Sequence, residues 1–280
     1  MLKTPTSTIV LAIVLVAGTA FQATTINPGQ LFVEAFAQDI VGDDNDNDLT
    51  GTPANENVIG EGGNDNLDGG GGQDTIIGDN LEGDGDGGDD TIVSGDEGGI
   101  NEGDNNIGNG NGGDDTIDSG DGEDQNIGDN RIGAGNGGDD TIDSGGGNDE
   151  NIGDNGLGSG DGGDDIIDSG EGDDFNVGDN FTGDGDGGDD KIKSGKGNDA
   201  NCGDNGNFDF VTEQFICGTD GNGGDDKING GQGDDTFTGG GGADKFQCGK
   251  GEDTVTDFDE TEGDKASGNC EGIEKGNSKK

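Results

Sequence analysis

Two repeat lengths run through the chain and constrain what it can fold into. The tetrapeptide Gly-Gly-Asp-Asp begins at five positions from Gly87 to Gly187, always 25 residues apart, and Gly-Asp-Asn recurs with the same period from Gly78. Nine-residue units of the form Gly-Gly-x-Gly-x-Asp-x-U-x, in which U is apolar, fill 60–77 and 221–256 in tandem, with few departures. A fixed period of this kind predicts stacked, near-identical coils.

The composition explains why apolar packing alone cannot hold such a stack. Of 280 residues 68 are glycine, and 65 acidic residues face 12 basic ones, so the net charge is −53. Low apolar content with high net charge is typical of disordered chains. We therefore expect the bare chain to be disordered and to need a hard cation, since such cations prefer carboxylate and carbonyl oxygens as ligands.

The composition also argues against two classes of function. The chain has no histidine, the commonest general base in catalysis. Between residues 38 and 190 its only basic residue is Arg131, whereas phosphate binding needs basic patches. We expect no enzymatic activity and no nucleic-acid partner.

The nonapeptide can be translated into local structure. Glycines at positions 1, 2 and 4 permit positive φ and close backbone approach, so the first six residues are expected to form a tight turn. Carbonyl oxygens of that turn and the aspartate at position 6 then face a common point. The last three residues, such as Thr116–Asp118, form a short strand whose middle side chain points inward. Two units make a flattened coil, and a cation fits between the turns of stacked coils.

These motifs resemble the RTX, or hemolysin-type, calcium-binding repeats. The resemblance covers about residues 57–258 and implies an all-β fold, a right-handed parallel β-roll or β-helix solenoid with multiple calcium ions (Ca²⁺) between its turns. The implied ligands are backbone carbonyls and the position-6 aspartates. These aspartates are Asp65, Asp74, Asp90, Asp115, Asp140, Asp165, Asp190, Asp226, Asp235, Asp244 and Asp253.

The 25-residue units, at about 78–205, divide as nine, nine and seven. In the second nine the apolar residue falls at position 9 instead of 8, yet aspartate still occupies position 6. These further ligand candidates are Asp124, Asp149, Asp174 and Asp199.

The extra seven residues either bulge sideways from an 18-residue roll or form a third side of the coil. An insertion at 207–217 falls in the last such segment and favours the bulge, because edge loops tolerate insertions better than strands do. The apolar column of Ile107, Ile132 and Leu157 argues for the third side.

The ends of the chain carry other signals. Residues 1–37 resemble a secretory signal peptide, cleaved after Ala37 or alternatively after Ala20. We predict an acidic linker at 38–56 and a C-terminal cap or tail at 259–280. No later segment is long and apolar enough to cross a membrane, so we expect a secreted or cell-surface protein.

Four cysteines suit an oxidising compartment. They allow three pairings, and sequence proximity favours the disulfides Cys202–Cys217 and Cys248–Cys270.

The sequence thus predicts a secreted or cell-surface protein that folds on binding calcium and has a structural or interaction role. A calcium-dependent adhesin or matrix protein is the alternative, with a cell-surface, matrix or mineral partner left open. A secreted hydrolase, or an accessory to one, is disfavoured, because no segment outside the repeats is long enough for a catalytic domain. Ice binding needs an outward threonine ladder, which breaks at Ile166.

Overall fold

The computed structural model describes residues 39–158, 160–183, 185–209, 214–217 and 223–275, which belong to one unit, Phe36–Lys280. The predicted signal peptide at 1–37, with both cleavage positions, lies outside the described residues.

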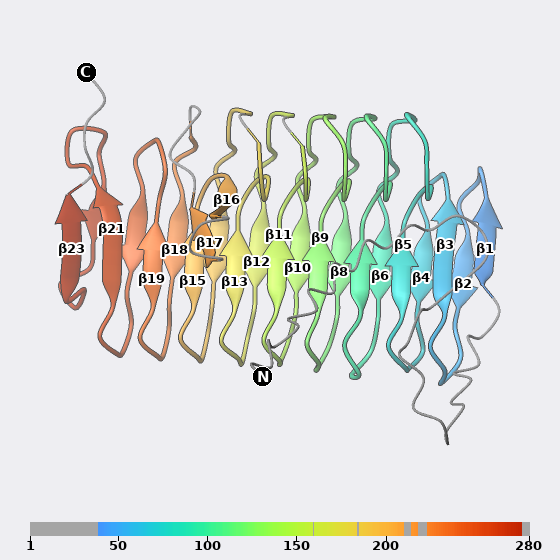
Figure 1. Ribbon diagram of the computed structural model, residues 1–280, viewed down its shortest axis with the longest axis horizontal. Helices are drawn as coiled ribbons and strands as arrows, with labels where there is room; N and C mark the ends of the chain where they lie inside the picture. The colour runs from blue at the N-terminus through green and yellow to red at the C-terminus, as the bar shows by residue number, and fades with distance from the viewer. Residues whose placement is uncertain (1–38, 159, 184, 210–213, 218–222, 276–280) are drawn as a thin grey trace, which may run out of the picture. The chain divides into compact units, whose positions relative to one another are not determined.

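The described residues form two long parallel sheets of very short strands (Figure 1). Sheet A contains, in order, β1 (Ile40–Asp43), β3 (Asn57–Glu61), β5 (Thr75–Ile77), β7 (Ile100–Glu102), β9 (Gln125–Ile127), β11 (Glu150–Ile152), β13 (Phe175–Val177), β15 (Ala200–Cys202), β19 (Thr236–Thr238), β21 (Thr254–Phe258) and β23 (Gly272–Lys275). Sheet B contains β2 (Asp48–Thr50), β4 (Asn66–Asp68), β6 (Thr91–Val93), β8 (Thr116–Asp118), β10 (Thr141–Asp143), β12 (Ile166–Asp168), β14 (Lys191–Lys193), β18 (Lys227–Asn229), β20 (Lys245–Gln247) and β22 (Lys265–Ala266). A separate antiparallel hairpin joins β16 (Gly206–Asp209) to β17 (Gln214–Cys217).

The chain alternates between the two sheets, and each strand pairs in parallel with the strand one coil away. Ile117 of β8, for example, is in register with Ile142 of β10, and Asn126 of β9 with Asn151 of β11. This arrangement confirms the predicted all-β parallel β-roll. Among the described residues, no helix has the length and apolar content needed to span a membrane.

The main core lies between the sheets and consists mostly of the inward-facing residues of sheet B, with sheet A contributing near both ends of the stack. In sheet B the pattern is exposed, buried, exposed, as in Thr116, Ile117 and Asp118. One inward side chain per short strand gives a row of apolar residues along sheet B. The buried members of the main core are Val58, Leu67, Ile76, Ile92, Ile117, Ile142, Ile167, Ile192, Ile228, Phe237, Phe246, Cys248 and Val255.

Sheet A departs from this pattern in what we call the middle coils, residues 78–205. There the inward position of sheet A is asparagine, and these asparagines form a buried ladder in which each amide donates to the next coil. Asn126 Nδ2, for instance, donates to Asn151 Oδ1 at 2.9 Å and to Ser119 Oγ at 3.0 Å. Between its two ends the ladder satisfies polar groups that would be costly to bury unpaired, and only Asn101 Oδ1 and Asn201 Nδ2 at the ends lack a partner among the ladder amides. Its members are Asn101, Asn126, Asn151, Asn176 and Asn201.

The apolar residue displaced to position 9 is buried on the other side of sheet A. Ile127, Ile152, Val177 and Cys202 form a second, smaller core there, against which Phe175, Phe181 and Cys217 pack. The Cys202–Cys217 disulfide joins the hairpin to this core, so both predicted disulfides, the other being Cys248–Cys270, are confirmed.

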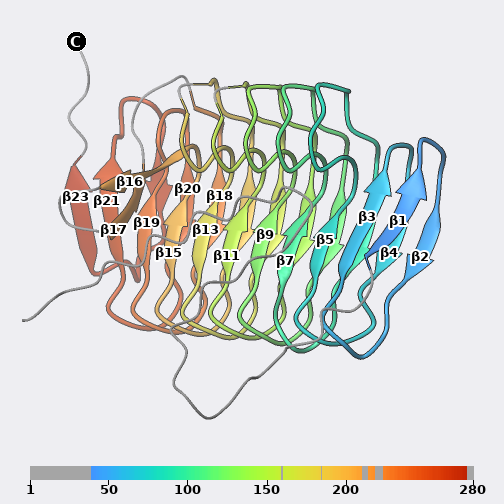
Figure 2. The ribbon, with the colours of Figure 1, turned by 45° about the vertical axis from the view of Figure 1, so that its right-hand side comes forward.

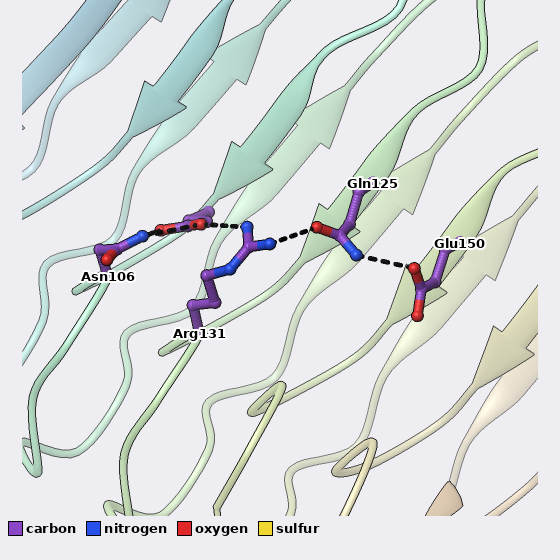
Figure 3. Close-up of polar contacts among 5 residues, drawn as sticks. Asn106, Gln125, Arg131 and Glu150 are labelled. Carbon is purple, nitrogen blue, oxygen red and sulfur yellow. Dashed lines mark hydrogen bonds and ion pairs between the residues drawn. The ribbon is translucent and has the colours of Figure 1, made fainter. Parts of the chain in front are cut away.

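One coil places a charge in the second core. Glu102 is fully buried at the position that Ile127 occupies one coil later. Arg131 Nη1 lies 2.7 Å from Glu102 Oε1, and Asn106 Nδ2 donates to the same carboxylate (Figure 3). Arg131 Nη2 also donates to Gln125 Oε1, and Gln125 Nε2 donates to Glu150 Oε2, both at 2.7 Å. Burial raises the pKa of Glu102, while the Arg131 charge opposes that shift.

Two assignments from the sequence need correction. Residues 38–56, predicted to be a linker, contain β1 and β2, which pair with β3 and β4 and so begin both sheets. The extra seven residues do not form independent bulges, because they stack through parallel bridges such as Ile107 to Ile132 and Ile132 to Leu157 (Figure 2). These three residues are nevertheless 43–49% exposed, so their column adds no apolar third side to the main core.

Candidate metal centres along the two edges

The coils have two edges that differ in length. At the short edge the chain passes from sheet B to sheet A, through turns such as Ser119–Asp124 in the middle coils. At the long edge it returns to sheet B, through connections such as Gly103–Asp115, which carry the extra residues. Every predicted ligand aspartate lies directly before a strand, at one edge or the other.

The short-edge turns have the conformation that the nonapeptide predicts. Gly120 and Gly122 have φ values of +78° and +146°, which side chains other than glycine rarely adopt. A Cβ on Gly147 would lie 1.1 Å from the carbonyl oxygen of Gly122 in the preceding coil, so this close stacking also requires glycine.

At both edges the aspartates stack in columns. The backbone N–H of most of them donates to Oδ1 of the aspartate in the next coil, at 2.9 Å from Asp124 to Asp149 and 2.6 Å from Asp115 to Asp140. The short-edge column is interrupted once, at Gly99, whose N–H donates to Asp124 Oδ1. The column crosses the repeat types, since Asp190 N–H donates to Asp226 Oδ1 and Asp226 N–H to Asp244 Oδ1. The N-terminal coil, which contains β1 and β2, contributes Asn47 to the long-edge column and Glu56 to the short-edge column.

The second oxygen of these carboxylates is where a cation can bind. Oδ2 is buried and has no hydrogen-bond partner in all but one of the predicted ligands, the exception being Asp244. The short-edge members are Asp74, Asp124, Asp149, Asp174, Asp199, Asp235 and Asp253. The long-edge members are Asp65, Asp90, Asp115, Asp140, Asp165, Asp190 and Asp226.

Burial makes these carboxylates costly to ionise without a counter-charge. Desolvation raises the pKa of Asp124 and of Asp174 to about 7 at the short edge. At the long edge it raises the pKa of Asp90 to about 8 and the pKa of Asp115 and of Asp140 well above the ordinary range. A bound cation would offset this cost and favour the ionised form.

The long edge of the middle coils departs from the predicted turn. Gly110, Gly112 and Gly113 do not have positive φ, so the Gly-Asn-Gly-Gly-Asp-Asp run is not the tight turn that the nonapeptide predicts. These glycines permit close approach instead. A Cβ on Gly112 would lie 1.4 Å from Asp129 Oδ1 and 2.8 Å from Asp104 Oδ2.

The long edge also contains aspartates that the sequence analysis missed. They come from the Gly-Asp-Asn tripeptides, and Asp79, Asp104, Asp129 and Asp154 lie beside the position-6 aspartates in three clusters. The clusters are Asp79–Asp90–Asp104, Asp104–Asp115–Asp129 and Asp129–Asp140–Asp154, each with one oxygen per residue, all within 4.8 Å of one another. The 25-residue period of Gly-Asp-Asn was the signal that could have identified them.

A comparison with protein families identifies the repeat. The model of the RTX calcium-binding nonapeptide repeat matches in four copies, over residues 50–80, 159–175 and 220–255. The chain carries RTX calcium-binding repeats. It is thus a calcium-binding repeat protein, and the matched regions include the tandem nonapeptides at both ends. Neither the curated proteins nor the solved structures contain a match to the chain.

The residues present fit calcium. The side chains in the RTX columns offer carboxylate oxygen, apart from the amide oxygen of Asn47, and Ca²⁺ binds both kinds of oxygen. The buried Oδ2 atoms without hydrogen-bond partners are oriented by backbone N–H groups on Oδ1, as a preformed site requires. Bound calcium would supply positive charge between coils, while the chain's own contribution is to position and desolvate the carboxylates.

Proposed function

We propose that this is an exported structural protein whose β-roll forms only when calcium binds between its coils, with the position-6 aspartates of both edges as ligands. The observation that carries the proposal is the pair of aspartate columns, in which one oxygen of almost every carboxylate is buried without a partner.

The dependence of folding on calcium follows from charge and burial. In the middle coils the main apolar core is a single file of side chains from sheet B, and the chain carries a net charge of −53. Without cations, folding would bring ionised carboxylates together in a place that water does not reach, which is strongly unfavourable. Calcium binding to the folded state then adds directly to folding stability, as in other proteins whose metal site exists only when folded.

Export is supported by the sequence of residues 1–37 and by the two disulfides, which suit an oxidising compartment. Calcium-dependent folding fits such a protein, because a chain that stays unfolded at low calcium folds where calcium is abundant. A structural role fits a chain without histidine better than catalysis does.

The direct test is circular dichroism of the metal-free chain during titration with calcium, and with magnesium as the control. We expect a disordered spectrum in chelator, a β spectrum with calcium, and little change with magnesium at the same concentration. A spectrum that is the same in chelator and in calcium would contradict the proposal.

A further inference from the structure

We propose that the long edge of the middle coils holds a line of calcium ions in three-carboxylate sites that adjacent coils share. The inference rests on the calcium binding proposed above but concerns a different ligand set. Its distinguishing ligands are the Gly-Asp-Asn aspartates, namely Asp79, Asp104, Asp129 and Asp154, which lie outside the nonapeptide.

The spacing of the carboxylates fits one ion per cluster. Asp104, Asp115 and Asp129 each offer an oxygen, and the three oxygens lie within 4.8 Å of one another. Calcium binds oxygen at about 2.3–2.6 Å, so two oxygens on one ion are at most about 5 Å apart. Three oxygens within 4.8 Å of one another are at most about 2.8 Å from their common centre, so a single calcium ion can contact all three residues after only a small shift of the side chains.

A second observation, independent of clustering, points to a missing ligand. Asp104 and Asp115 are 0% and 2% exposed, and Asp104 Oδ1 and Asp115 Oδ2 have no hydrogen-bond partner. Their other oxygens are occupied, because Asp104 Oδ2 accepts from Gly113 N–H and Asp115 Oδ1 accepts from Asp90 N–H. Backbone groups thus fix one side of each carboxylate and leave the other for an ion.

Because neighbouring clusters share ligands, the number of carboxylates per coil shows which ionic charge would balance them. Asp104 belongs to the first two clusters and Asp129 to the last two, so each coil adds one Gly-Asp-Asn aspartate and one position-6 aspartate. Two carboxylates per coil are balanced by one divalent cation per coil. A monovalent cation would leave half of this buried charge uncompensated.

Burial favours calcium over magnesium at these sites. Magnesium requires bond lengths of about 2.0–2.1 Å and usually retains several water molecules. The cluster residues are all buried, which leaves the ion to be held by the protein's own oxygens. At the short edge, by contrast, the middle coils supply at most one column aspartate per coil, and the coil of Gly99 supplies none.

The test is the number of calcium ions bound to the full-length chain and to matched variants, measured by mass spectrometry of the metal after removal of free calcium. Asp104→Asn with Asp129→Asn removes a carboxylate charge from all three clusters, which leaves too little negative charge to balance a divalent ion, so we expect the loss of three ions. The control Asp114→Asn with Asp139→Asn makes the same charge change at exposed neighbours and should lose none.

The outcomes separate the two proposals. Wild-type protein that binds no calcium would overturn both. Wild-type protein that binds calcium, together with an Asp104→Asn, Asp129→Asn variant that binds as many ions, would overturn the shared line alone.

Crystals of the wild-type chain grown with calcium give a test that does not depend on how a variant folds. We expect anomalous scattering between Asp104, Asp115 and Asp129. Peaks at the short edge alone would overturn the inference.

Discussion

The middle coils and the C-terminal coils, formed by β18 to β21, continue the same sheets but differ in what those sheets enclose. In the C-terminal coils both sheets turn an apolar residue inward, as Ile228 and Phe246 do from sheet B and Phe237 and Val255 from sheet A. In the middle coils sheet A turns asparagine inward. The extra segment thus accompanies an exchange of apolar burial for hydrogen bonds and buried carboxylates.

This difference indicates that two combinations of interactions can stabilise the stacking of RTX-type coils. The C-terminal coils combine aspartate columns with a core of aromatic and aliphatic side chains. The middle coils have less apolar contact between the sheets and a second set of buried aspartates at the long edge. Their stability should therefore depend more strongly on cations.

The largest expected effect is that of pH on the metal-free chain. Burial raises the folded-state pKa values at the long edge of both regions, to about 8 for Asp244 in the C-terminal coils and well above the ordinary range for Asp115 and Asp140 in the middle coils. The middle coils add Asp104 and Asp129, whose pKa values burial also raises well above the ordinary range. The folded state then binds more protons than the unfolded chain, so stability falls as pH rises from about 4 through these values.

We expect the metal-free chain to be more folded at pH 5 than at pH 8, and the middle coils to open first as the pH rises. Hydrogen exchange of peptides from each region, corrected for the intrinsic pH dependence of exchange, measures this order. Equal protection of the backbone amides in the two regions at both pH values would contradict the proposed difference between them.

A smaller effect is expected at the buried ion pair of the middle coils. Arg131→Ala leaves Glu102 buried without its cation, which should lower the free energy of unfolding by about 3 kcal/mol in calcium. Adding Glu102→Ile extends the column of Ile127 and Ile152 by one coil and should restore stability. Denaturation of the single and double variants gives the comparison, and an Arg131→Ala variant as stable as wild type would show that the pair contributes nothing.

The smallest effect should come from the asparagine ladder. Asn151→Leu removes the acceptor of Asn126 Nδ2 and should cost about 1–2 kcal/mol. Asn201→Leu should cost less, because Asn201 Nδ2 already lacks a partner and the residue pairs in register with Phe237. Equal losses in thermal denaturation would argue that the ladder does not act as a continuous network.

The features that the sequence predicted correctly are those with a local cause. The short-edge turns follow from glycine at positions 2 and 4, and the position-6 aspartate lies directly before its strand. The inward isoleucine of sheet B follows from the alternation of a three-residue strand, as in Thr116–Asp118.

The features that were missed depend on how one coil lies over the next. Nothing local shows that Asn126 faces the core while Ile127 faces away from it, because either orientation fits a three-residue strand. Asp104 becomes a candidate ligand only through its neighbours Asp115 and Asp129, one of which is 25 residues away. The first coil was not predicted for a similar reason. Asn47 and Glu56 occupy its positions in the two columns, where the later coils have aspartate.

The aspartate column at the long edge joins coils of unequal length. Its N–H to carboxylate bonds span 18 residues from Asp226 to Asp244, 25 from Asp115 to Asp140, and 36 from Asp190 to Asp226, where the β16–β17 hairpin intervenes. The stack therefore specifies the rise between coils and leaves their circumference free. Whole coils can therefore be added to or removed from such a protein, and residues can be inserted at the long edge of a coil, while the neighbouring strands keep their pairing.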